Sequence, residues 1–138
     1  MTQWLAGMRL TADRLNDNTI DDTTSTGATA ATGFSVNDFF GQKVNGITTI
    51  TISCTRSGAN IAEIATNSGN ISDTAMATLP AGWRPPNLIE AMWDSGFNDG
   101  GATISTSGVI TLRTTSGSNG IQTSQAPRVT ACWISQND

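Results

Sequence analysis

Residues 47–55, Ile-Thr-Thr-Ile-Thr-Ile-Ser-Cys-Thr, are the clearest indication of the fold. They are rich in β-branched side chains, which are enriched in strands. Ile and Thr alternate along them with a period near two, as in a strand that buries one face. The Thr side chains on the other face indicate that this face stays in contact with water. We therefore expect a β-protein with hydroxyl-coated sheets.

Outward from this strand, further short apolar segments alternate with turn signals such as Ser57-Gly58, Asn98-Asp-Gly-Gly101 and Ser107-Gly108. About eight short strands at this spacing, without a long helix, are typical of a sandwich or barrel. We predict a mainly β head domain over residues 34–138, an antiparallel, jelly-roll-like β-sandwich. The further strands are expected at residues 34–40, 61–66, 75–79, 88–94, 102–105, 109–113, 121–123 and 128–134.

Residues 1–33 differ from the rest and are predicted to form an N-terminal anchor. Near the start, apolar residues recur at a 3-4-3 spacing, which places them on one face of a short helix. So short a helix is not stable alone in water, so it packs either on its own domain or on another chain. Residues 17–33 are rich in Thr, Ala and Ser and are expected to be an extended connector or a strand with one wet face. The anchor residues are Trp4, Leu5, Met8 and Leu15.

Composition excludes several classes of function. The chain has no His, which removes His-based catalysis and His-ligated metals. Its seven basic residues and net charge of −4 argue against nucleic-acid binding. No apolar run is long enough to span a membrane, so no membrane insertion is expected. The N-terminus lacks the pattern of a signal peptide, and we expect a protein made in the host cytoplasm.

Enzymatic activity is not expected, and neither is a cofactor or a metal. Glu63 and Glu90 are the only glutamates, and no motif brings them together as a paired-carboxylate site. Cys54 and Cys132 lie in strand-like segments without a basic neighbour, and we expect two reduced, buried side chains rather than a disulfide.

The segment Leu79-Pro-Ala-Gly-Trp-Arg-Pro-Pro86 is distinctive because its three prolines restrict the backbone. We expect a rigid structural corner that places Trp83 in the core or in a subunit interface; the alternative is a ligand contact by stacked Trp83 and Arg84. The corner residues are Pro80, Gly82, Trp83, Arg84 and Pro85.

A second cluster, around Trp93, combines aromatic, carboxylate and amide side chains. An exposed aromatic ring beside such groups is how sugars are commonly bound, because the ring stacks while the polar groups bind hydroxyls. The alternative is a core Trp followed by a solvated acidic turn. The candidate receptor-binding residues are Trp93, Asp94, Phe97, Asn98 and Asp99.

Three segments resemble small tail-fibre or minor tail proteins of tailed bacteriophages, particularly those of actinobacterial hosts. They are the opening Trp4-Leu-Ala-Gly-Met-Arg-Leu-Thr-Ala-Asp-Arg-Leu-Asn16, the proline segment at 79–86, and the hairpin 102–112 followed by the strand 128–134. Together they span most of the chain in the family's order.

The resemblance implies a virion protein, located on the tail or another surface of the particle. It implies a homotrimeric head, fixed to tail, baseplate or capsid proteins by its N-terminal segment, that adheres to a host-surface receptor, a glycan. The alternative is a capsid or tail decoration protein without a receptor role.

Overall fold

The computed structural model describes residues 22–44, 46–116 and 119–135, and all regular secondary structure in them is β. The anchor residues Trp4, Leu5, Met8 and Leu15, and the helix expected with them, lie outside the described residues. No helix in the described ranges has the length and apolar character needed to cross a membrane. The strands are β1 (Asp22–Thr24), β2 (Thr29–Ala30), β3 (Phe34–Val44), β4 (Ile47–Arg56), β5 (Asn70–Thr78), β6 (Ile89–Asp94), β7 (Asp99–Ile104), β8 (Val109–Thr114) and β9 (Arg128–Ile134).

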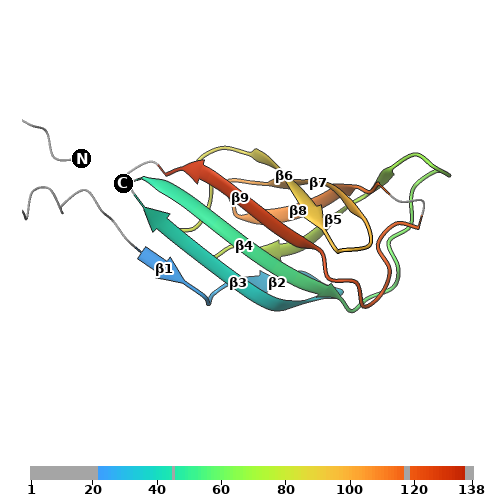
Figure 1. The fold of residues 1–138 in the computed structure, drawn as a ribbon, viewed down its shortest axis with the longest axis horizontal. Coiled ribbons are helices and arrows are strands. Elements are labelled where there is room, and N and C mark those ends of the chain that lie inside the picture. The colour runs from blue at the N-terminus through green and yellow to red at the C-terminus, as the bar shows by residue number, and fades with distance from the viewer. Residues whose placement is uncertain (1–21, 45, 117–118, 136–138) are drawn as a thin grey trace, which may run out of the picture.

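All pairings between these strands are antiparallel, and they form one sheet in the order β1-β3-β4-β9-β6-β7-β8-β5-β2. The sheet curls, so that β3 also approaches β2 and β5 from the other end of the order (Figure 1). Beyond β2, the Ala31 amide donates to the Met76 carbonyl at 3.0 Å, and the Phe34 amide donates to the Ala31 carbonyl at 3.0 Å. The expected mainly β, antiparallel fold is therefore confirmed.

Both edges of the sheet come from one short segment. β1 pairs with β3, and β2 pairs with β5, yet only residues 25–28 separate β1 from β2 along the chain. The described part of the expected connector, residues 22–33, thus contains two strands of the sheet.

The core lies inside the curl, where alternate residues of every long strand point. On β4, Ile50, Ile52 and Cys54 are buried, whereas Thr49 and Thr51 face outward, as the alternating sequence predicts. Trp93 of β6 and Val129 of β9 close the same core. Its other fully buried large side chains are Ile71, Met76, Leu79, Ile104, Ile110, Leu112 and Ile121.

The strands expected at 61–66 and 121–123 are wrong. Ile61 forms one isolated bridge with Ile121, and Glu63 forms one with Ile71. Glu63 explains why the segment turns: its carboxylate accepts the amide of Asn67 at 3.0 Å and that of Gly69 at 2.7 Å, which closes a loop in place of a second ladder.

Two expected boundaries also move. β3 does not end at Gly41 but continues to Val44. Glycine is needed at this position of the strand because a Cβ would come within 2.6 Å of the Trp83 ring. The turn expected at residues 98–101 lies instead at Ser95–Asn98, and Asp99 already belongs to β7. Gly100 belongs in this strand because the backbone of Thr114 passes so close that a Cβ would meet its carbonyl oxygen at 1.9 Å.

The cysteines have opposite environments. Both thiols are free, but Cys54 is buried while Cys132 is exposed. The expectation that both are buried is therefore wrong for Cys132, which occupies an outward-facing position of β9.

The proline segment forms a corner against the core. Trp83 is buried, and its amide donates to the Pro80 carbonyl at 3.1 Å, with Gly82 at a positive φ of 83°. The cation over its ring is Lys43, 5.0 Å from the centroid, and not the neighbouring Arg84. Arg84 instead donates through Nε to the Leu79 carbonyl at 3.0 Å. Pro85 is buried in the same corner.

Candidate functional site: a hollow at the distal end of the sheet

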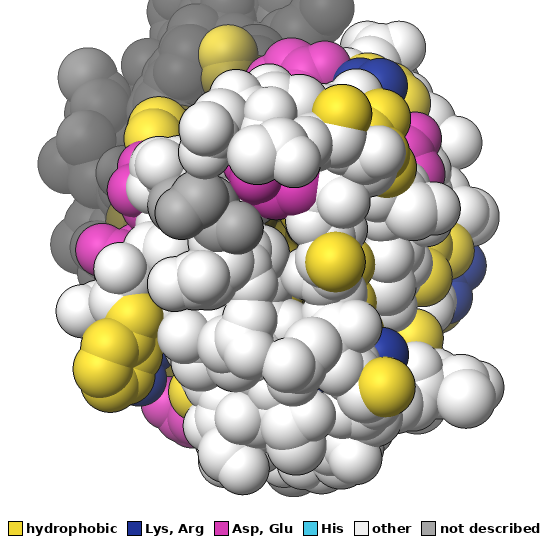
Figure 2. Space-filling model, turned by 90° about the vertical axis from the view of Figure 1, so that its right-hand side faces the viewer, with side chains coloured by type: hydrophobic (Ala, Val, Ile, Leu, Met, Phe, Trp, Pro, Cys, Tyr) yellow, Lys and Arg dark blue, Asp and Glu magenta, His cyan; other side chains and the backbone are white. Residues whose placement is uncertain are grey.

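The molecule is elongated, and its two ends differ (Figure 1). β1 begins and β9 finishes at one end, beside Gly46 in the β3–β4 turn; we call this the proximal end. The Ser95–Asn98 turn and the loop of residues 57–69 lie at the other, distal end. Figure 2 views the distal end, where uncharged polar groups dominate and acidic and apolar side chains form small separate patches.

A hollow of about 760 Å³ opens beside this end, over the outer faces of β6 and β9. We call it the distal hollow. Its lining residues are Ser53, Met92, Trp93, Asp94, Ser95, Gly96, Asp99, Ala126, Arg128 and Thr130.

Strand register brings the polar residues of the hollow together. Asp99 pairs with Asp94 across the β6–β7 hairpin, Asp94 pairs with Arg128, and Arg128 pairs with Ser53. Asp38 pairs with Ser53 at the far end of this row. The row therefore crosses five strands, β7-β6-β9-β4-β3, on the outer face of the sheet. We call it the polar row.

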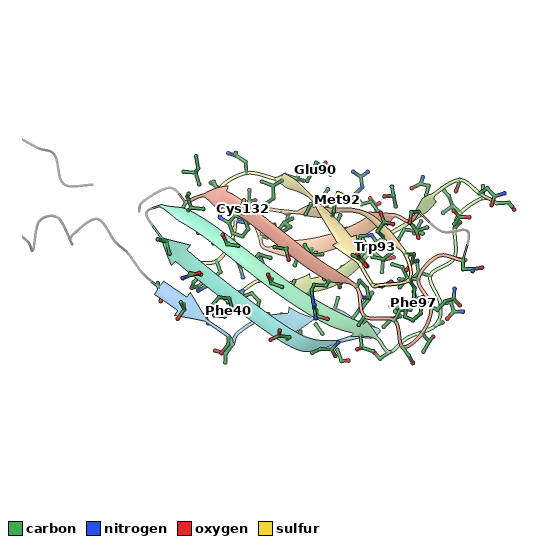
Figure 3. All side chains as sticks on the ribbon, viewed as in Figure 1. Phe40, Glu90, Met92, Trp93, Phe97 and Cys132 are labelled. Carbon is green, nitrogen blue, oxygen red and sulfur yellow. The ribbon has the colours of Figure 1, made fainter. Side chains whose placement is uncertain are left out.

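The next row on the same face is less polar. Phe40 pairs with Thr51, Thr51 with Thr130, and Thr130 with Met92. Phe40 and Met92 are exposed, and the Thr51 and Thr130 hydroxyls lie 3.2 Å apart between them. Met92 gives the hollow its most exposed apolar wall, at 69% exposure (Figure 3).

The five candidate receptor residues have different roles. Trp93 is only 1% exposed and donates through Nε1 to the Thr114 carbonyl at 3.0 Å, so the expectation of an exposed stacking ring is wrong for it. Asn98 is also turned inward: its Nδ2 donates to Thr115 Oγ1 at 3.1 Å and to the Gly120 carbonyl, and its Oδ1 accepts from Ser95 Oγ at 2.6 Å. Asn98 thus holds the turn to the neighbouring loop.

The other three are available to a ligand. Asp94 and Asp99 line the hollow. Phe97 is 85% exposed at the tip of the turn, outside the hollow lining (Figure 3). The Asp94 carboxylate fixes the turn through one oxygen, which accepts the Gly96 amide.

Sequence reasoning missed Ser53 and Arg128. Both lie on strands that are distant in sequence from the Trp93 cluster and become neighbours only through the β4–β9 and β6–β9 pairings. The alternation of apolar and polar residues predicts which side chains of a strand face outward, but it does not predict which strands pair with one another.

The lining of the hollow combines charged, polar and apolar side chains. Among the residues that the structure describes, no three His, Cys, Asp or Glu side chains are grouped to bind a metal. Carboxylate acceptors, guanidinium and hydroxyl donors and an apolar wall are the groups that bind hydroxyl-rich ligands. No protein-family model matches the chain, and a search of curated proteins likewise found no match.

Proposed function

We propose that this chain is a structural virion protein, the head of a bacteriophage tail fibre or baseplate, and that it adheres to a glycan on the host surface. The proposal rests on the resemblance of its sequence segments to tail proteins and on one structural observation. That observation is the distal hollow, which lies toward the end of the sheet away from the start of β1. An attachment segment before β1 would leave the hollow facing away from the particle.

A glycan suits the lining of the hollow. Sugar hydroxyls both donate and accept hydrogen bonds, and the hollow offers carboxylates that accept and Arg128 and Ser53 that donate. Met92 supplies apolar surface for a ring face, in place of the buried Trp93. Phe97 can contact a further sugar unit from the turn.

The finer architecture belongs to the same proposal. The curled sheet, with β1 and β2 at its edges, is the jelly-roll-like sandwich head, and the segment before β1 fixes it to the particle through Trp4, Leu5, Met8 and Leu15. Three copies form the head. Exposed apolar residues toward the proximal end support this, because Ile47 pairs with Ile134, which is 76% exposed, and exposed Leu88 precedes β6. Burying them between copies stabilises an oligomer.

Three weak sites on one trimer would act together, so that avidity gives firm adhesion without a tight single site. Adhesion of the fluorescently labelled full chain to host cells tests the function. We expect Asp94→Ala to reduce the retained protein by about tenfold, because it removes a charged hydrogen-bond acceptor from each site.

Asp22→Ala is the matched control, since Asp22 is an exposed aspartate on β1, far from the hollow. It should leave adhesion unchanged. Equal adhesion of the Asp94→Ala variant and the unmodified chain would contradict the proposed site. A chain that remains on particles but adheres to no host cell would be a decoration protein instead.

A further inference from the structure

We propose that the distal hollow selects a saccharide bearing a free ammonium group, that is, an amino sugar whose amine is not acylated. This inference rests on the proposed function and names the ligand class for the same site. It follows from how the charges of the polar row are arranged and from how few of them are neutralised within the chain.

The first observation is a pair of carboxylates that form no ion pair with another described residue, although Arg128 lies opposite Asp94 in the strand register. Asp94 and Asp99 are directly opposite on adjacent strands, where Cβ atoms lie about 5 Å apart and like charges repel. The ion pair among the described residues is Arg113 with Asp73, at 3.2 Å and outside the hollow. The repulsion between Asp94 and Asp99 is therefore available to be relieved by a cation from outside.

The second observation is that each carboxylate is held by one oxygen and open at the other. Asp94 Oδ1 accepts the Gly96 amide, and Asp99 Oδ1 accepts the Ser116 hydroxyl. Among the described residues, nothing donates to either Oδ2. The carboxylates are thus fixed in orientation while keeping acceptors for the N–H groups of an ammonium ion.

The third observation is Ser53, which points to a ligand independently of the acidic pair. Ser53 is 4% exposed, lines the hollow, and its hydroxyl has no hydrogen-bond partner in the part of the chain that the structure describes. Among the described residues no fully enclosed side-chain polar atom lacks a partner, so the Ser53 hydroxyl is open to the hollow that it lines and is available to a ligand. A sugar hydroxyl entering the hollow supplies that partner.

Arg128 determines which way the ligand lies. It is in the middle of the polar row, between Asp94 and Ser53, and its guanidinium has no ion pair in the described residues. The guanidinium repels an ammonium group and donates to neutral oxygens. The amine is therefore placed at the Asp94–Asp99 side, and the sugar hydroxyls lie toward Arg128 and Ser53.

Calorimetric titration of the full chain tests the inference with two probes of equal length. One is a tetramer of β-1,4-linked glucosamine with free amines, and the other is the N-acetylated tetramer. At about pH 5.5, sugar amines are protonated, and the pH is above the ordinary range of Asp carboxyls. We expect the free-amine tetramer to bind about tenfold more tightly, as for a hydrogen bond between charged groups, and salt to weaken this binding.

Variants separate the ammonium from the sugar. Asp99→Asn keeps the shape of the side chain and should weaken the free-amine tetramer about tenfold, with little effect on the acetylated one. Arg128→Gln removes a repelling charge and keeps an N–H donor, so it should increase the preference for the free-amine tetramer over the acetylated one. Asp22→Asn, at the proximal end, should change neither.

Equal binding of the two tetramers, or a smaller preference for the free-amine tetramer in the Arg128→Gln variant, would overturn the ammonium inference. It would leave glycan adhesion standing. No binding of either tetramer would also overturn the inference. The proposed function has a separate test and fails if Asp94→Ala leaves host-cell adhesion unchanged.

Discussion

Cys54 is the buried member of the two thiols, and its environment has a measurable consequence for stability. Burial among the apolar side chains of the curl raises the pKa of the Cys54 thiol from 9.0 to about 11. Between these two values the unfolded chain releases the proton while the folded chain keeps it. The contribution of this thiol to the free energy of unfolding is therefore fully present below pH 9 and is lost as the pH rises toward 11.

We expect this loss to be at most about 3 kcal/mol across that window, since each pKa unit corresponds to about 1.4 kcal/mol. Urea denaturation followed by Trp fluorescence at a series of pH values measures it. Cys54→Ala should flatten the curve, whereas Cys132→Ala should not, because the Cys132 thiol is exposed in the folded chain. A curve that keeps its slope in Cys54→Ala would assign the alkaline loss to other groups.

Individual residues also show how the structure places the candidate site residues that the sequence suggested. Asp94 and Asp99 lie in the hollow, as the acidic cluster suggested. The ring of Trp93 is buried and does not face the solvent. The general preference of Trp for burial therefore predicted its position better than its acidic and amide neighbours did. Asn98 was misplaced because its two partners, Thr115 and Gly120, are supplied by a loop distant in sequence.

At the scale of elements, β7 combines glycines, which are uncommon in strands, with a close approach to the backbone of a neighbouring strand. It begins Asp99-Gly100-Gly101, and Gly100 faces the Thr114 carbonyl at the end of β8. Two adjacent glycines indicate a turn when read alone, so the preference of the sequence and the requirement for close approach conflict here.

Substitution of the two glycines should therefore have unequal effects. In Gly100→Ala the Cβ would meet backbone at 1.9 Å, and we expect a loss of about 3 kcal/mol in the free energy of unfolding. In Gly101→Ala the nearest atom is the Thr114 hydroxyl at 3.0 Å, which has to move by only a few tenths of an ångström and can keep the hydrogen bond that it accepts from the Gly101 amide, so about 1 kcal/mol is expected. Chemical denaturation of both variants measures the difference. Similar losses would mean that intrinsic strand preference, and not the approach of β8, requires glycine there.

Elements were predictable where one face is apolar and the other is rich in Thr, as in β4. Residues 61–66 carry a similar pattern, but Glu63 binds the amides of Asn67 and Gly69 and turns the chain. Local hydrogen bonds of this kind are not visible in apolar periodicity. The order of strands in the sheet was not predictable either, because register between distant segments depends on the packing of the whole core.

At the scale of the whole molecule, two chemically different ends lie on one sheet face. The polar row lies distally, and the apolar pair Ile47 and Ile134 lies proximally, with Thr-rich rows between them. The low charge content of the chain, 13%, favours close approach of identical copies, because like-charge repulsion between them is small.

The native mass measures assembly. Three chains of 14.4 kDa should give a species of about 43 kDa by light scattering after size-exclusion chromatography. Ile47→Ser should shift this toward the monomer, because it removes apolar surface from the proximal contact. Ile64→Ser is the control, since Ile64 is equally apolar and exposed but lies in the distal loop. A monomer at all concentrations, or equal effects of the two variants, would contradict proximal trimer contacts.

The single origin of both sheet edges has a consequence for solubility. β1 and β2 are three and two residues long, and they cover the outer sides of β3 and β5, which have eleven and nine. A proteolytic cut within residues 25–28 would separate β1 from β2, so that the backbone groups of residues 41–43 on β3 and 77–78 on β5 could lose their partners together. Sheet edges without partners pair with strands of other molecules, so one cleavage would favour intermolecular β-sheet aggregation from both edges.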